Sequence, residues 1–144
     1  MTSEIRFSKA QETILDLLAD TNFNNLNGLD ISIDLRQHPS LWRSAYFTSA
    51  SIERSPDETW VFAQYRSDFI SLRDLPAGYL HLDTLLLLPT VGGQDALMNL
   101  TSVWGADVVE WIGTEEAGHV MGDSESVKDY SADPDRVILF LWWD

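Results

Sequence analysis

The stretch Tyr79-Leu80-His81-Leu82-Asp83-Thr84-Leu85-Leu86-Leu87-Leu88-Pro89 decides the fold. Apolar and polar residues alternate over its first half, which is the period of a strand with one face in solvent. The four residues from Leu85 to Leu88 are apolar without a break, so a strand here has to be covered on both faces. Gly78 and Pro89 limit the run to a length that favours a strand over a helix. The stretch therefore predicts a central strand.

The segments before this strand predict one helix followed by strands. Ser8 and Gln11 form a capping box, and the apolar residues after them recur at helical spacing, so we expect an amphipathic helix over 9–20. Residues 22–28, which close with Asn27-Gly28, have turn chemistry. Ile31, Ile33 and Leu35 alternate with polar residues, which predicts a half-buried strand that ends at His38-Pro39.

The aromatic-rich region in the middle of the chain leaves one alternative open. Residues 42–53 and 60–65 are rich in aromatic and β-branched side chains, which favours strands. Ser55-Pro56-Asp57-Glu58 between them fits the loop of a hairpin and also the first turn of a helix. The composition of the residues that follow favours the hairpin, and 68–72 would extend or follow its second strand.

The segments after the leucine run complete an α+β pattern. We expect a helix over 94–104 that covers Leu85 to Leu88, strands over 108–112 and 136–143, and between them a polar stretch, 113–135, with at most one helical turn at 125–130. The order predicts a single domain over 1–144. In this α+β domain, an antiparallel or mixed sheet of about five to six strands carries the helices near 9–20 and 94–104 on one face.

Net charge is the most informative bulk property of the chain. Lys and Arg number 9 against 23 Asp and Glu, a formal charge of −14, and the last 40 residues carry 10 of the acidic residues and 2 of the basic ones. Such a field repels nucleic acid and anionic membranes, and it attracts basic partners. The charge could also serve solubility alone.

Cysteine is absent, which excludes disulfides and thiolate chemistry. The first residues contain no apolar export signal, and the leucine run is too short to span a bilayer. We therefore expect a cytoplasmic location, and we expect no cofactor.

Three patterns could carry chemistry, and each is explained more simply by structure. His81 and Asp83 share a strand face and could orient a general base, but no nucleophile stands beside them in the sequence. Glu115, Glu116, His119 and Asp123 offer metal ligands at a spacing that matches no zinc motif, and Gly118 weakens a helix there, so a solvated acidic loop is favoured. The glycines of Val91-Gly92-Gly93-Gln94 fit a tight turn and not a nucleotide loop.

Adjacent Trp142 and Trp143 close the last predicted strand. Neighbouring strand residues point to opposite faces, so either both faces are covered there or one indole is exposed beside Asp144. An exposed indole among carboxylates would suit a contact with a cationic partner.

These features favour a small acidic binding protein over an enzyme. We expect an inhibitor that blocks a basic protein such as a nuclease toxin, as an immunity-type protein or a mimic of nucleic acid, acting as a monomer or homodimer. The residues expected to contact the partner are acidic or aromatic: Asp107, Glu110, Glu115, Glu116, Asp123, Glu125, Asp129, Tyr130, Asp133, Asp135 and Trp143. Two alternatives stay open. One is a small hydrolase or metal-dependent enzyme that uses His81, Asp83 and His119, and the other is a subunit of a homo-oligomer joined through Trp142 and Trp143.

Overall fold

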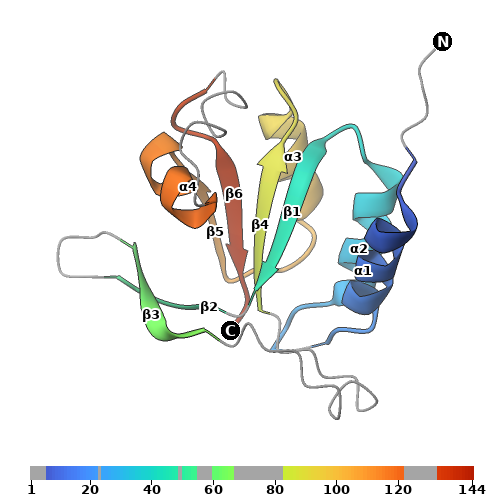
Figure 1. Ribbon diagram of the computed structural model, residues 1–144, viewed down its shortest axis with the longest axis horizontal. Coiled ribbons are helices and arrows are strands. Elements are labelled where there is room, and N and C mark those ends of the chain that lie inside the picture. The colour runs from blue at the N-terminus through green and yellow to red at the C-terminus, as the bar shows by residue number, and fades with distance from the viewer. Residues whose placement is uncertain (1–5, 23, 49, 55–59, 67–82, 122–132) are drawn as a thin grey trace.

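The leucine run lies in the interior of an antiparallel sheet. The computed structural model describes residues 6–22, 24–48, 50–54, 60–66, 83–121 and 133–144, and these form an α+β fold (Figure 1). Strand β4 (Thr84–Pro89) is buried along its whole length. It pairs on one side with β1 (Trp42–Thr48) and on the other with β6 (Ile138–Trp142). The predicted central strand is confirmed over these residues, whereas 79–82 lie outside the described part of the chain.

The sheet has four strands, so the prediction of five to six was wrong. The strand order is β1-β4-β6-β5, with β5 (Val108–Ile112) at one edge, and every neighbouring pair is antiparallel. Strands β2 (Ala50–Arg54) and β3 (Trp60–Arg66) pair with each other in a separate two-stranded sheet. The predicted strand over 42–53 is therefore two strands in different sheets. The predicted hairpin strands are confirmed, and the link 55–59 and the extension 68–72 lie outside the described residues.

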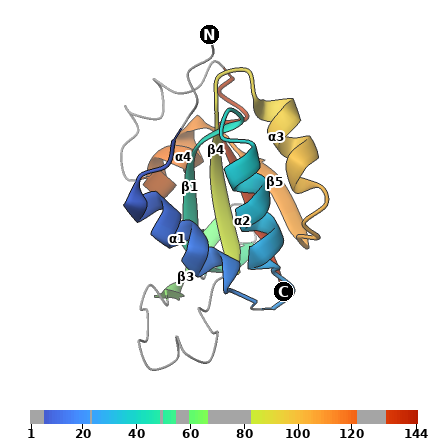
Figure 2. The ribbon, with the colours of Figure 1, turned by 90° about the vertical axis from the view of Figure 1, so that its right-hand side faces the viewer.

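Both faces of the four-stranded sheet are covered, as the unbroken leucines require. Leu85 and Leu87 join a core with the helices α1 (Lys9–Ala19), α2 (Gly28–Gln37) and α3 (Gln94–Thr101). Leu86 and Leu88 point to the opposite face and pack in a second core that includes Ala117 of α4 (Thr114–Met121). Figure 2 shows α1, α2 and α3 in front of the sheet, and Figure 1 shows α4 on the other side.

The first helix forms as predicted. The hydroxyl of Ser8 accepts a hydrogen bond from the N–H of Gln11, while the Gln11 side chain accepts one from the Ser8 N–H. Helix α3 is also confirmed, although it ends at Thr101, before the predicted 104. It contributes Leu97 to the core that holds Leu85 and Leu87, so it covers one face of the leucine run.

Residues 31–36 are helical, so the predicted strand was wrong. Ile31 and Leu35 stand one helical turn apart and are fully buried, whereas Ile33 is 40 % exposed. Asn27 caps α2 by accepting from the N–H of Asp30. Gly28 allows α2 to begin against the end of α1, because a Cβ atom at this position would lie 1.9 Å from the carbonyl oxygen of Leu18. Three apolar residues spaced by two could not distinguish this helix from a strand.

The start of the predicted polar stretch 113–135 is also helical. Helix α4 runs through Gly118, which the sequence indicated as a weak point for a helix. Its N-terminus is held by the N–H of Thr114, which donates to the carbonyl of Pro134, and the buried Ala117 fixes its apolar side against the sheet. The helices therefore occupy both faces of the sheet, and not one face as expected. Residues 122–132 lie outside the described part of the chain.

Candidate acidic binding surface

Apart from Glu110, the acidic residues of the last third that the structure describes lie at two opposite ends of the sheet. Asp107 precedes β5, and its carboxylate accepts a hydrogen bond of 2.8 Å from the N–H of Asp144, which follows β6. Glu115 and Glu116 follow β5, while Asp133 and Asp135 precede β6. Because β5 and β6 are antiparallel, with Val108 opposite Trp142 and Ile112 opposite Ile138, these two sets lie at opposite ends. The tertiary structure thus separates Asp107 from the others.

We call the larger set, together with Asp95, the acidic end and define it as Asp95, Glu115, Glu116, Asp133 and Asp135; two of these carboxylates, those of Asp95 and Asp133, pair with Arg136. The guanidinium Nη1 of Arg136 lies 2.7 Å from the Asp95 carboxylate, and Nε lies 2.7 Å from that of Asp133. The N-terminus of α4 is tied to the same loop, because both the N–H and the hydroxyl of Thr114 donate to the carbonyl of Pro134. Three segments, 94–95, 114–116 and 133–136, therefore meet at this end.

Close backbone packing fixes this junction. A Cβ atom on Gly113 would lie 3.1 Å from the carbonyl oxygen of Pro134, which is tighter than ordinary contact. The N–H of Val137 donates to the carbonyl of Ile112, so β6 begins directly beside the end of β5. The position of Glu115 relative to Asp133 is thus set by backbone contacts and not by the carboxylates, which repel one another.

Arg136 organises the carboxylates that it contacts. It lowers the pKa of Asp133 below its ordinary value of 3.8, chiefly through the side-chain hydrogen bond and then with help from the N–H of Asp135. The hydrogen bonds to Asp133 and Asp95 raise the pKa of Arg136 in turn. The guanidinium also lies over the ring of Trp111, 5.8 Å from its centroid, in a cation–π contact. Arg136 thus pairs with two of the five carboxylates of the acidic end, which keeps a net negative charge.

The carboxylates of the acidic end are accessible. The Asp95 side chain is 88 % exposed even with its ion pair, whereas that of Asp133 is 31 % exposed. Glu115 and Asp135 are exposed, and Glu116 is half-buried. Exposed ion pairs contribute little to stability. The charges of the acidic end therefore affect the electrostatic potential at this surface more than they affect the stability of the fold.

Asp95, Arg136 and Trp111 were missed by sequence reasoning. Asp95 is 41 positions from Arg136, and no local pattern links the two residues. The signal in the sequence that could have pointed to Arg136 is the rarity of basic residues, which number two after residue 104. A lone arginine in an acidic segment must have carboxylate neighbours, but the sequence could not show which.

Glu110 lies between the two ends, on the face of the sheet that α4 covers. It is half-buried opposite Phe140, and Val108 and Ile112 on the same face pack against the core that contains Phe140. The other expected contact residues lie outside the described part of the chain: Asp123, Glu125, Asp129 and Tyr130.

Trp143 is a core residue, which corrects the expectation of an aromatic anchor at this position. It is 0 % exposed, and its indole N–H donates to the carbonyl of Trp104. It packs in the core that contains Leu85 and Leu139, on the face of the sheet that α1, α2 and α3 cover. Trp142 points to the opposite face and is half-buried, with a buried Nε1 that has no hydrogen-bond partner among the described residues. A symmetric contact through both tryptophans is therefore not available in this fold.

The residues of the alternative catalytic hypothesis are only partly described. Asp83 is half-buried, and its carboxylate accepts a hydrogen bond of 2.8 Å from the Thr84 hydroxyl. His81 lies outside the described residues, and His119 stands on α4 one turn after Glu115. Among the residues that the structure describes, no three His, Asp or Glu side chains form a group that could hold a metal ion.

None of the described helices is both long enough and apolar enough to span a membrane. Comparison of the chain with protein-family models, with curated proteins and with solved structures gives no match.

Proposed function

We propose that this protein binds a basic protein partner through the acidic end and acts as a small inhibitor, either an immunity-type protein or a mimic of nucleic acid. The observation that supports this proposal is the placement of Asp95, Glu115, Glu116, Asp133 and Asp135 at one end of the sheet, where Arg136 pairs with Asp95 and Asp133. These carboxylates come from three segments that the fold holds together despite their mutual repulsion.

Inhibition would operate by occlusion. Carboxylates at the acidic end would occupy the positions that phosphate groups take on the partner, where Arg and Lys side chains bind them through charge-assisted hydrogen bonds. The net charge of −14 would speed the encounter, because opposite charges steer two proteins together before contact. Since Trp143 is buried, we assign the aromatic part of the contact to Trp111, whose ring lies against the Arg136 guanidinium.

The test starts with affinity capture from the source cells and identification of the captured protein. The association rate of the purified pair is then measured at increasing salt concentration. We expect a basic partner, one-to-one stoichiometry and an association rate that falls steeply with salt. A partner of neutral or acidic charge, or a rate that does not change with salt, would overturn the proposal.

A matched pair of variants locates the surface. Glu115→Gln with Glu116→Gln removes two charges from the acidic end, and Asp20→Asn with Asp30→Asn removes two charges from α1 and α2. Glu115 and Glu116 both lie in the first turn of α4, whereas Asp20 caps the C-terminus of α1 and Asp30 lies in the first turn of α2, so the stability of each variant is measured beside its association rate. We expect the first pair to slow association severalfold and the second pair to slow it much less. Equal effects would show that only net charge matters.

A further inference from the structure

Strand β5 is an edge strand with a regular backbone. It pairs with β6 on one side, and no other described strand pairs with it on the outer side. Its register with β6 runs from Val108 to Ile112 without a shift, and all five of its residues are partly exposed. In Figure 2 it lies at the border of the sheet, beside α3. An edge of this kind presents backbone N–H and C=O groups that another strand can pair with.

The other edge strand of the sheet is built differently. The register of β1 with β4 shifts between Trp42 and Ser44, so Arg43 bulges out of the ladder. The bulge also explains why Trp42 and Ala45, three positions apart, both pack against the same core. A bulge and an exposed basic residue are two devices that discourage pairing at an edge. The sheet carries both at β1, whereas β5 lacks the bulge.

The charges along β5 indicate what it could pair with. Asp107 precedes the strand, Glu110 stands in its middle, and Glu115 and Glu116 follow it. Antiparallel pairing with a second copy, centred on Glu110, would place two glutamates opposite each other between two chains that each carry −14. An extended segment that carries Lys or Arg would instead meet opposite charge along its length.

We propose that the outer edge of β5 binds an extended basic segment of the partner protein as an additional strand of the sheet. This inference rests on the proposed function and specifies how the partner is engaged. Backbone hydrogen bonds along β5 would supply affinity, while carboxylates at both ends of the strand would select for basic side chains. The segment would bridge the two acidic sets that the fold separates.

The experiment uses the full chain and a nine-residue peptide that alternates Lys and Thr, with both ends blocked. Its control is the same peptide with every backbone nitrogen methylated, which keeps the charge and removes all the backbone donors. Affinity is measured by calorimetry, and amide hydrogen exchange locates the contact. We expect the unmethylated peptide to bind at least about tenfold more tightly, since several ladder hydrogen bonds are lost on methylation. We also expect it to slow exchange at β5 and not at β1.

The outcomes separate this inference from the proposed function. If both peptides bind equally and with the same salt dependence, contact is by charge alone; pairing at β5 is then wrong, while the acidic end remains a binding surface. Failure of both peptides to bind, or slowed exchange at β1, also overturns pairing at β5. The captured partner tests the function independently. Glu110→Gln should weaken peptide binding more than Asp20→Asn, and equal effects would count against a site at β5.

Discussion

Trp104 and Asp34 are joined by a hydrogen bond of 2.7 Å from the indole Nε1 to the carboxylate Oδ2, although they lie 70 positions apart. The carbonyl of Trp104 in turn accepts the indole N–H of Trp143. A chain of hydrogen bonds thus runs from Trp143, the residue after β6, through the turn after α3, to α2. It joins the N-terminal helices to the sheet through polar contacts as well as apolar ones.

Replacing Asp34 by Ala should lower the free energy of unfolding by about 1.5–3 kcal/mol, because the indole N–H of Trp104 loses a charged acceptor. Trp104 is only 6 % exposed, so water is poorly placed to replace the carboxylate. Asp34→Asn keeps an acceptor oxygen and should cost less. Urea denaturation followed by tryptophan fluorescence measures both variants. If the two cost the same, the hydrogen bond does not carry this contribution.

The assignment of α2 as a helix is tested by substitutions at three positions. Leu35→Ala should destabilise the protein by about 2–5 kcal/mol, because its fully buried side chain leaves a cavity. Ile31→Ala should behave in the same way. Ile33→Ala should change stability by less than about 0.5 kcal/mol, since this side chain is 40 % exposed on the outer face. Similar large losses at all three positions would restore the strand interpretation.

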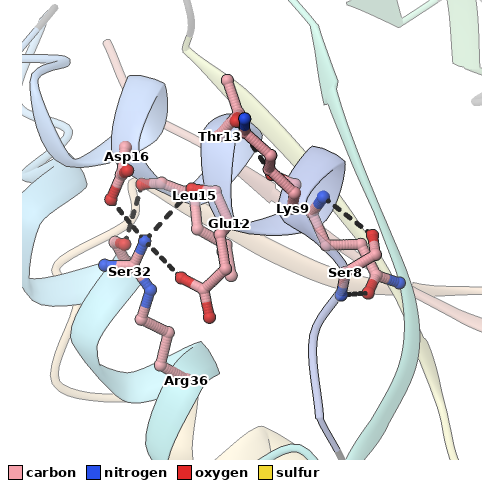
Figure 3. A network of polar contacts seen from close by, with 9 residues as sticks. Ser8, Lys9, Glu12, Thr13, Leu15, Asp16, Ser32 and Arg36 are labelled. Carbon is pink, nitrogen blue, oxygen red and sulfur yellow. Dashed lines mark hydrogen bonds and ion pairs between the residues drawn. The ribbon is translucent and has the colours of Figure 1, made fainter.

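Removal of Arg136 should change the titration of Asp133. The ion pair lowers the pKa of Asp133 below 3.8, so its contribution to stability is present above that value and is lost as pH falls through the lowered pKa. In Arg136→Gln the pKa of Asp133 should rise towards 3.8, and the stability difference from the parent protein should shrink below that pH. NMR titration of the carboxyl carbons measures the shift. Arg36→Gln is the control, because Arg36 pairs with Glu12 and Asp16 and not with Asp133 (Figure 3).

The two adjacent tryptophans should respond differently to Phe. Trp143→Phe removes the donor to the Trp104 carbonyl and reduces a fully buried side chain, so we expect a loss of about 1–3 kcal/mol. Trp142→Phe removes a buried indole N–H that has no partner in the described part of the chain, so it should cost less and could increase stability. Thermal unfolding of both variants gives the comparison. A larger loss at Trp142 would contradict the positions assigned to these side chains.

The sequence predicted the parts of the fold that depend on local chemistry. The capping box of Ser8 and Gln11 predicted α1, and the leucine run predicted a strand covered on both faces. The prediction of a strand over 31–36 was wrong because, in a short segment, three apolar residues fit both the period of a strand and that of a helix. The cap at Asn27 and the acid at Asp30 mark the start of α2, although Asn27-Gly28 also suits a turn and the residues after it alternate like a strand.

The sequence predicted that the candidate site is rich in carboxylates, but it did not predict which of them lie together in the fold. The surplus of carboxylates after residue 104 is visible in the sequence, and four of them, Glu115, Glu116, Asp133 and Asp135, do lie at one end of the sheet. Asp107 lies at the other end because β5 runs between them, and Asp95 joins the set through Arg136. Strand pairing brings these residues together, and no local pattern encodes it.

By itself, the sequence determined the charge of this protein, the α+β class and the burial of β4, because net charge is a sum over residues and burial on both faces follows from an unbroken apolar run. Only the tertiary structure decided that α2 is a helix, that Trp143 is a core residue, and which carboxylates share one end of the sheet. These depend on contacts between residues far apart in the chain, such as the close approach of Gly28 to Leu18 and the antiparallel pairing of β5 with β6.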